Sequence, residues 1–177
     1  MRACIVDITE VDRPEALDQV AWYLRSRGWN VDEVEVDPAD SSGPGGARDR
    51  VAAAFAHTPQ PLMDSWAFAG LIRQQVSGCD VVVLSDRAGL GGIFALEMAN
   101  QRSETAQQVW TVAGNSEMLR LLRTGGSLAT TDDELESVLD WEIAQYVASD
   151  RVICRSAIER QLLDGIGVEA VPVPIHK

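Results

Sequence analysis

The sequence predicts an α/β protein of the Rossmann-like type, with helices on both faces of a mostly parallel sheet of about six strands. Two observations carry this prediction. Short apolar runs alternate with longer amphipathic segments along the whole chain, as repeated strand–helix units require. The run Val81–Leu84 is apolar at every position, as expected for a central parallel strand that is buried on both faces. We expect residues 1–177 to form one such domain.

The size and composition are those of an ordinary globular protein. The chain has 177 residues, of which 46% are apolar and 24% are charged. A domain of this length can bury a core without disulfides or a metal. The 15 Lys and Arg against 27 Asp and Glu give a net charge of -12, and no basic stripe is visible. This charge argues against a nucleic-acid partner.

The first part of the chain contains two predicted strands with a helix between them. Residues 3–8 form a buried strand, and Pro14 opens a helix that Gly28 ends. Residues 29–36 alternate as a half-exposed strand. Trp22 is interpreted as a packing residue of the helix. The other helical core positions are Leu17, Val20, Ala21 and Leu24.

The middle of the chain surrounds the central strand. Segment 37–48 is rich in Gly, Pro and Ser and is expected to be a loop. Helices are predicted at 51–55 and 62–76, before the central strand at 80–84. A glycine-rich turn then leads into a helix at 93–100.

The remaining elements continue the alternation. Thr131 and Glu134 are spaced as a capping box at the start of a long helix, and Ser156 is placed to cap a shorter one. Pro172 interrupts the last strand, which suits an edge position. The predicted elements are strand 109–112, helix 116–122, helix 132–147, strand 151–154, helix 157–163 and strand 168–173.

The cysteines and the chain start indicate an ordinary cytoplasmic protein. Cys4, Cys79 and Cys154 lie far apart, in or beside β-branched runs, so each is expected to be a small buried core residue. Because the chain has only 2 His and no C-x-x-C, no zinc pattern is present and we expect no metal. We also expect no cofactor. No leader-like segment and no apolar stretch of about 20 residues is present, so no membrane segment is predicted.

Candidate site residues gather where the predicted strands end. In open α/β sheets, ligands bind outside the carboxyl ends of the strands. Asp, Ser and Asn also cap helices at such positions, so a purely structural role is an alternative for each residue. The polar and glycine residues at these ends are Asp7, Thr9, Ser85, Asp86, Gly114, Asn115, Arg155 and Ser156.

Gly91 and Gly92 are candidates for close approach of the backbone to a ligand. They precede the predicted helix at 93–100, where backbone N–H groups can face a phosphate or carbohydrate oxygen. Phe94 stands where the dinucleotide fingerprint requires a third glycine, which argues against NAD. The sequence also contains neither G-K-[ST] nor G-x-S-x-G, the motifs of nucleotide triphosphatases and α/β-hydrolases.

The C-terminal third resembles a known enzyme family. Residues 141–156 combine a Glu-bearing helix, the small-residue–Asp pair Ser149-Asp150 and a "V-I-x-x-S" strand. Glu159–Gly167 ends in "L-x-x-x-G", and Val168–Ile175 is rich in valine and proline. In these features the chain resembles the end of the N-terminal domain of retaining, GT-B-fold glycosyltransferases of the family 4 type. Asp80–Asp86 also resembles the central strand of that family.

The resemblance implies that the chain is the acceptor-binding half of a glycosyltransferase. The nucleotide-sugar donor would be bound by a second domain that is absent from this chain, and the isolated domain would be inactive. An apolar face that normally meets the second domain would favour self-association. The resemblance assigns no catalytic residue. The implied cleft contacts, to the acceptor or to a phosphate, are Asp86, Gly91, Gly92, Asn115 and Ser156.

Two alternatives remain open at this point. Thr9–Pro14 occupies the loop where the family usually carries a Gly-Gly pair, and Asn115 follows the strand after which many members carry a His. These departures motivate a non-catalytic sugar- or partner-binding module of the same fold. A flavodoxin-like or receiver domain is less compatible, because it requires a downstream Lys and the first Lys of the chain is Lys177.

Overall fold

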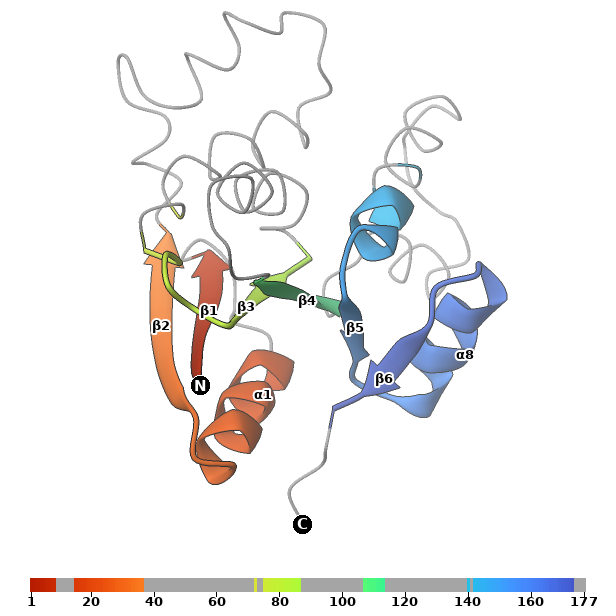
Figure 1. Cartoon of the computed structure of the whole chain (residues 1–177). Coiled ribbons are helices and arrows are strands. Elements are labelled where there is room, and N and C mark those ends of the chain that lie inside the picture. The colour runs from red at the N-terminus through yellow and green to blue at the C-terminus, as the bar shows by residue number, and fades with distance from the viewer. Residues whose placement is uncertain are drawn as a thin grey trace, which may run out of the picture.

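A parallel β-sheet forms the centre of the computed structural model, which describes residues 1–8, 15–36, 72, 75–86, 107–113, 140 and 142–173. Within these residues six strands lie in the order β2-β1-β3-β4-β5-β6, and every neighbouring pair is parallel (Figure 1). The carboxyl ends of all six strands therefore lie along one edge. The strands are β1 (Arg2–Ile8), β2 (Asn30–Val36), β3 (Val81–Ser85), β4 (Gln108–Ala113), β5 (Arg151–Cys154) and β6 (Ala170–Pro172).

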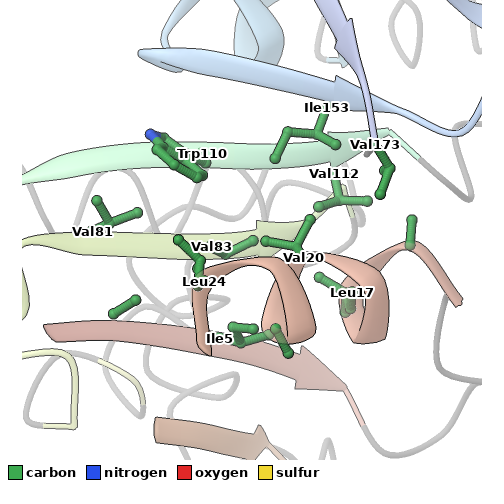
Figure 2. Close-up of a cluster of buried hydrophobic side chains, with 13 residues drawn as sticks. Ile5, Leu17, Val20, Leu24, Val81, Val83, Trp110, Val112, Ile153 and Val173 are labelled. Carbon is green, nitrogen blue, oxygen red and sulfur yellow. The ribbon is translucent and has the colours of Figure 1, made fainter. Parts of the chain in front are cut away.

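Helices cover both faces of the sheet, which confirms the predicted three-layer α/β/α fold. Helix α1 (Glu15–Ser26) packs on one face, where Figure 2 shows Leu17 and Leu24 lying over side chains of the central strands. Helix α8 (Ala157–Gly165) and a helical segment at 142–147 pack on the opposite face.

The two faces are separated by the alternation of side chains along each strand. Ile153 of β5 belongs to the cluster under α1, whereas Val152 and Cys154 pack with Leu163 of α8 and with Tyr146. Successive residues of a strand point to opposite faces, so a central strand can be apolar throughout. All five residues of β3 are buried for this reason.

Both labelled helices end in the same way. Gly28 follows α1 with a φ of 79°, and Gly167 follows α8 with a φ of 83°. This left-handed conformation is easy for glycine and lets the next N–H reach back across the last turn to an otherwise unpaired carbonyl. The closing hydrogen bonds run from Trp29 N to Leu24 O at 3.1 Å and from Val168 N to Leu163 O at 2.9 Å.

The two outer strands differ from the central ones. β2 carries an acidic residue at three of its seven positions and buries only Val36 fully. β6 is three residues long and ends in Pro172. Edge strands are commonly short, charged or interrupted by proline, because a free strand edge invites pairing with another chain.

One packing prediction was wrong. Trp22 is 44% exposed, although its helix is buried along one side. Each helical residue is turned by about 100° from the previous one, so Trp22 lies about 200° around the helix from Val20, on the side away from the sheet. The buried side consists of Ala16, Leu17, Val20, Ala21 and Leu24.

The predicted strand boundaries are confirmed to within about two residues, the usual uncertainty of such boundaries. Among the described residues, no helix has the length and apolar character that crossing a bilayer would need. Several predicted elements lie outside the described residues: the loop at 37–48, the helices at 51–55, 93–100 and 116–122, and most of the helices at 62–76 and 132–147.

Candidate functional site

The path of the chain through the sheet reverses between β1 and β3. From β1 the chain passes through α1 to β2 on one side, whereas β3 pairs with the other side of β1 (Figure 1). Doubly wound sheets bind ligands at such a switch point, outside the carboxyl ends of the two strands. The carboxyl ends of β1 and β3 are therefore the expected position of a ligand site.

Two buried polar residues, Asp7 and Ser85, lie at this switch point. Their exposed fractions are 7% and 2%. Each stands two positions after a residue that packs under α1, Ile5 in β1 and Val83 in β3. Because the side-chain period of a strand is two, Asp7 and Ser85 share the α1 face. Continuing the β1–β3 register one position beyond Val6 and Leu84 sets them side by side. This places a carboxylate beside a hydroxyl at the switch point.

Asp86, a predicted site residue, directly follows β3. Its side chain is buried, at 4% exposure, and its N–H donates to the Val112 carbonyl at 3.1 Å, which extends the β3–β4 ladder by one residue. By strand alternation it faces away from α1, toward the face that the segment at 142–147 covers. The carboxyl end of β3 thus displays a polar group on each face of the sheet.

The helical segment at 142–147 turns a largely polar stripe toward the sheet. Glu142, Gln145 and Tyr146 are 5%, 0% and 2% exposed, and Ser149 continues the same stripe at helical spacing. Helix stripes that face a core are normally apolar, and Glu and Gln are rarely fully buried. The segment therefore buries polar side chains at positions where a helix usually buries apolar ones, which suggests a role in addition to core packing.

Hydrogen bonds fix this segment to two strands. Gln145 Nε2 donates to the backbone carbonyl of Asp86 at 2.8 Å. Ser149 Oγ donates to the Gln145 carbonyl at 2.9 Å and lies 2.7 Å from Thr111 Oγ1 of β4. Since Thr111 lies within β4 and Asp86 lies beyond the end of β3, the segment runs toward the amino edge of the sheet. Glu142, one turn before Gln145, consequently lies farthest out along the carboxyl edge.

Ser156, another predicted site residue, is the N-cap of α8. Its Oγ accepts a hydrogen bond from the Glu159 N–H at 3.2 Å. The Glu159 carboxylate is 2% exposed; it accepts from the Arg155 N–H at 2.7 Å and from the Arg155 guanidinium at 3.0 Å. An acidic side chain at a helix start is stabilised by the helix dipole. The beginning of α8 therefore already holds an anionic group of its own.

Some of these residues were predicted from the sequence and others were not. Asp86 and Ser156 both lie at the carboxyl edge, one after β3 and the other after β5. Gly91, Gly92 and Asn115 lie outside the described residues. Asp7 and Ser85 were recognised only as residues at strand ends. The buried residues Glu142, Gln145 and Tyr146 share one helix face but were missed as a group, because polar residues of a predicted helix are ordinarily assigned to solvent.

The three cysteines are buried in the core, as predicted. Burial raises the pKa of Cys4 from its usual 9.0 to about 12, and it also raises the pKa of Cys79 and of Cys154. Thiols that stay protonated are poor nucleophiles and poor metal ligands. In the part of the chain that the structure describes, no three His, Cys, Asp or Glu side chains come together in a group that could hold a metal ion.

A solved structure is similar to nearly the whole length of this chain. It is the complex between a UDP-glucosyltransferase from Polygonum tinctorium, capable of glucosylating indoxyl, and 3,4-dichloroaniline. The fold is glycosyltransferase-like. The TM-score is 0.50 at 12% sequence identity, and the match covers 99% of this chain and 52% of that chain. The chain thus spans about half the length of this UDP-glucosyltransferase. No protein-family model and no curated protein matches the chain.

Proposed function

We propose that the chain is the acceptor-side domain of a glycosyltransferase that transfers a sugar from a nucleotide-sugar donor to a hydroxyl-bearing acceptor. The observation that carries the proposal is the set of buried polar side chains at the carboxyl edge of a glycosyltransferase-like sheet. Burying such groups costs free energy unless they are hydrogen-bonded. Their concentration at the edge where this class of sheet binds ligands favours a binding role over a purely structural one.

The donor side of the enzyme belongs to a second domain in this proposal. The match covers 52% of the similar glucosyltransferase, which leaves room in an enzyme of that size for another domain of comparable length. The sequence resemblance to the family 4 type suggests a retaining mechanism. The two domains would close around donor and acceptor, so this domain alone would bind ligands without transferring sugar.

The side chains at the carboxyl edge suit the recognition of an acceptor hydroxyl. A carboxylate such as Asp7 or Asp86 accepts a hydrogen bond from a hydroxyl, and Ser85 can both donate and accept. A hydroxyl held in this way has its oxygen directed toward the anomeric carbon of the donor, and such orientation is a large part of the catalytic effect in group transfer. The proposed cleft contacts are Asp86, Gly91, Gly92, Asn115 and Ser156, with Asp7 and Ser85 beside them.

A binding experiment tests this proposal directly. Ligand-observed NMR with UDP-glucose, glucose, indoxyl and 3,4-dichloroaniline would be run on the chain, on Asp7→Asn and Ser85→Ala, and on Asp164→Asn as a control. Asp164 lies on α8 in an exposed ion pair with Arg160 at 3.6 Å. We expect at least one compound to bind, and the two site variants to weaken it by about tenfold, the effect of one lost charged or strong hydrogen bond.

The result can also contradict the proposal. Unchanged affinity in both site variants would show that the switch point is not part of the binding site. Failure of every compound to bind would contradict a sugar-transfer role. Binding that leads to no transfer even with the complete enzyme would favour the alternative, a non-catalytic module of the same fold.

A further inference from the structure

Among the described polar side chains at the carboxyl edge, Gln145 has the lowest exposure. It is 0% exposed, and its Nε2 donates to the Asp86 carbonyl at 2.8 Å, across 59 positions of sequence. The orientation of the amide is fixed chemically, because a carbonyl oxygen only accepts hydrogen bonds. Among the described residues, no group donates to the Gln145 Oε1 atom, which is itself buried.

A half-satisfied amide is an expensive choice for this position. A buried acceptor without a partner costs about 1–3 kcal/mol, and an apolar side chain of similar length would avoid that cost. Unlike such an apolar side chain, the amide donates a hydrogen bond to the Asp86 carbonyl. Such departures from the best local choice are expected at functional sites.

The hydrogen bond completes the restraint of Asp86. The N–H of Asp86 donates to the Val112 carbonyl at 3.1 Å, and its carbonyl accepts from Gln145 at 2.8 Å. With the peptide groups on both sides held, the direction of the Asp86 Cα–Cβ bond is fixed as well, which limits where the carboxylate can lie. Gln145 is itself held, since its own carbonyl accepts from Ser149 Oγ, which contacts Thr111 of β4.

We propose that Gln145 is a positioning residue, which holds the backbone of Asp86 so that the Asp86 carboxylate faces the acceptor. The inference rests on the proposed function for the acceptor and on the observed contacts for the positioning. Side chains that contact a ligand work only when neighbouring groups lock them in place. Gln145 acts through Asp86, without contact with the ligand in this scheme.

The chain offers a closely matched control. Gln107 Nε2 donates to the carbonyls of Val76 and Cys79 at 2.9 and 2.8 Å. It makes the same kind of contact as Gln145, a side-chain amide on backbone carbonyls. However, it lies before β4 and ties the segment before β3, at the amino edge of the sheet. Gln145→Met and Gln107→Met therefore remove the same kind of interaction at opposite edges, one hydrogen bond in the first case and two in the second.

The first measurement is amide hydrogen exchange by NMR, which needs no ligand. In Gln145→Met we expect the Asp86 amide to exchange about tenfold faster relative to the Val83 amide in the middle of β3. In Gln107→Met that ratio should stay at its original value. Equal acceleration of both amides in Gln145→Met would mean a general loss of stability, and would overturn the positioning role.

A second variant distinguishes donation from packing. In Gln145→Glu the side chain keeps its shape, but only the protonated acid can donate to the Asp86 carbonyl. The exchange ratio should therefore be near its original value at about pH 5 and high at about pH 8, since burial raises the pKa of a carboxyl group. A ratio that does not change with pH would contradict the inference.

The binding measurement separates this inference from the proposed function. Whichever of UDP-glucose, glucose, indoxyl and 3,4-dichloroaniline binds the unsubstituted chain would be titrated into both Met variants. We expect Kd to rise about tenfold in Gln145→Met and to stay unchanged in Gln107→Met. Equal Kd values in the two variants would overturn a role in ligand recognition. If no compound binds, the proposed function fails, and hydrogen exchange still decides whether Gln145 positions Asp86.

Discussion

Asp150 and Val109 exchange two hydrogen bonds where β4 and β5 begin. The Val109 N–H donates to Asp150 Oδ2 at 2.7 Å, and the Asp150 N–H donates to the Val109 carbonyl at 2.9 Å. Arg2 and Asp80 repeat the arrangement where β1 and β3 begin, at 2.7 and 2.8 Å. In both cases an Asp directly before a strand pairs with the first part of the neighbouring strand. The Ser149-Asp150 pair, which carried part of the family resemblance, thus has a structural reason.

The first prediction concerns Asp150. Asp150→Ala should lower the free energy of unfolding by about 1–3 kcal/mol, because it leaves the buried N–H of Val109 without its acceptor. Asp150→Asn keeps an acceptor oxygen and should cost clearly less. Urea unfolding measures both variants. The control is Asp164→Ala, which removes an exposed ion pair on α8. It should change the free energy of unfolding by about 0.5 kcal/mol or less. If Asp150→Ala cost no more than this control, the prediction would be refuted.

The second prediction concerns alkaline pH. Burial raises the pKa of Cys4 from 9.0 to about 12, so between these values the thiol ionises in the unfolded chain and stays protonated in the folded one. The unfolded state is then favoured, and the free energy of unfolding should fall as the pH rises from about 9 toward about 12. Cys4→Ala should reduce this slope, as measured by urea unfolding at several pH values. An unchanged slope would show that other groups dominate.

The third prediction compares two large side chains of α1. Leu24 is 1% exposed and lies between the helix and the sheet, whereas Trp22 is 44% exposed (Figure 2 shows Leu24). Leu24→Ala should destabilise the protein by about 2–5 kcal/mol, through lost burial and the cavity that remains. Trp22→Ala removes a larger side chain but should cost less than about 1 kcal/mol. Thermal and urea unfolding measure both variants. A larger loss of stability in Trp22→Ala than in Leu24→Ala would contradict the prediction.

The fourth prediction separates the two roles of Ser156. Ser156→Ala removes the cap of α8 and should cost about 1 kcal/mol, whereas Ser156→Asn keeps a capping oxygen and should preserve stability. If Ser156 also contacts the ligand, as proposed, Ser156→Asn should weaken binding of the compound found by NMR while leaving the unfolding midpoint in place. Unchanged binding in Ser156→Asn would reduce Ser156 to a helix cap.

Local patterns in the sequence were enough to predict the strands. The run before Ser85 is apolar on both faces, and the elements from residue 151 to 165 follow from their own apolar spacing and from the cap at Ser156. These signals are complete within a few residues. Trp22 was misassigned although the spacing was informative, since a turn of about 100° per residue places it on the face opposite Leu17 and Leu24.

The candidate site depended on contacts that no local pattern contains. Asp7 and Ser85 become neighbours only through the parallel register of β1 and β3. Gln145 and Asp86 are 59 positions apart, and their hydrogen bond depends on how one helical segment lies over the end of a strand. Polar residues in an amphipathic helix are ordinarily assigned to solvent, so the burial of Glu142 and Gln145 was visible only in three dimensions.

The outer strands also determine how copies of this molecule can meet. Directly after β6 the Val173 N–H points inward, to the Cys154 carbonyl at 2.8 Å, so an N–H at position 172 would be directed outward, and Pro172 has none. At the opposite margin, β2 carries the charged side chains of Asp32, Glu33 and Glu35, of which Asp32 pairs with Arg2 and Glu33 with Arg25. Charged side chains on an edge strand disfavour pairing with another strand. Growth of the described sheet into a fibre is therefore hindered at both outer strands.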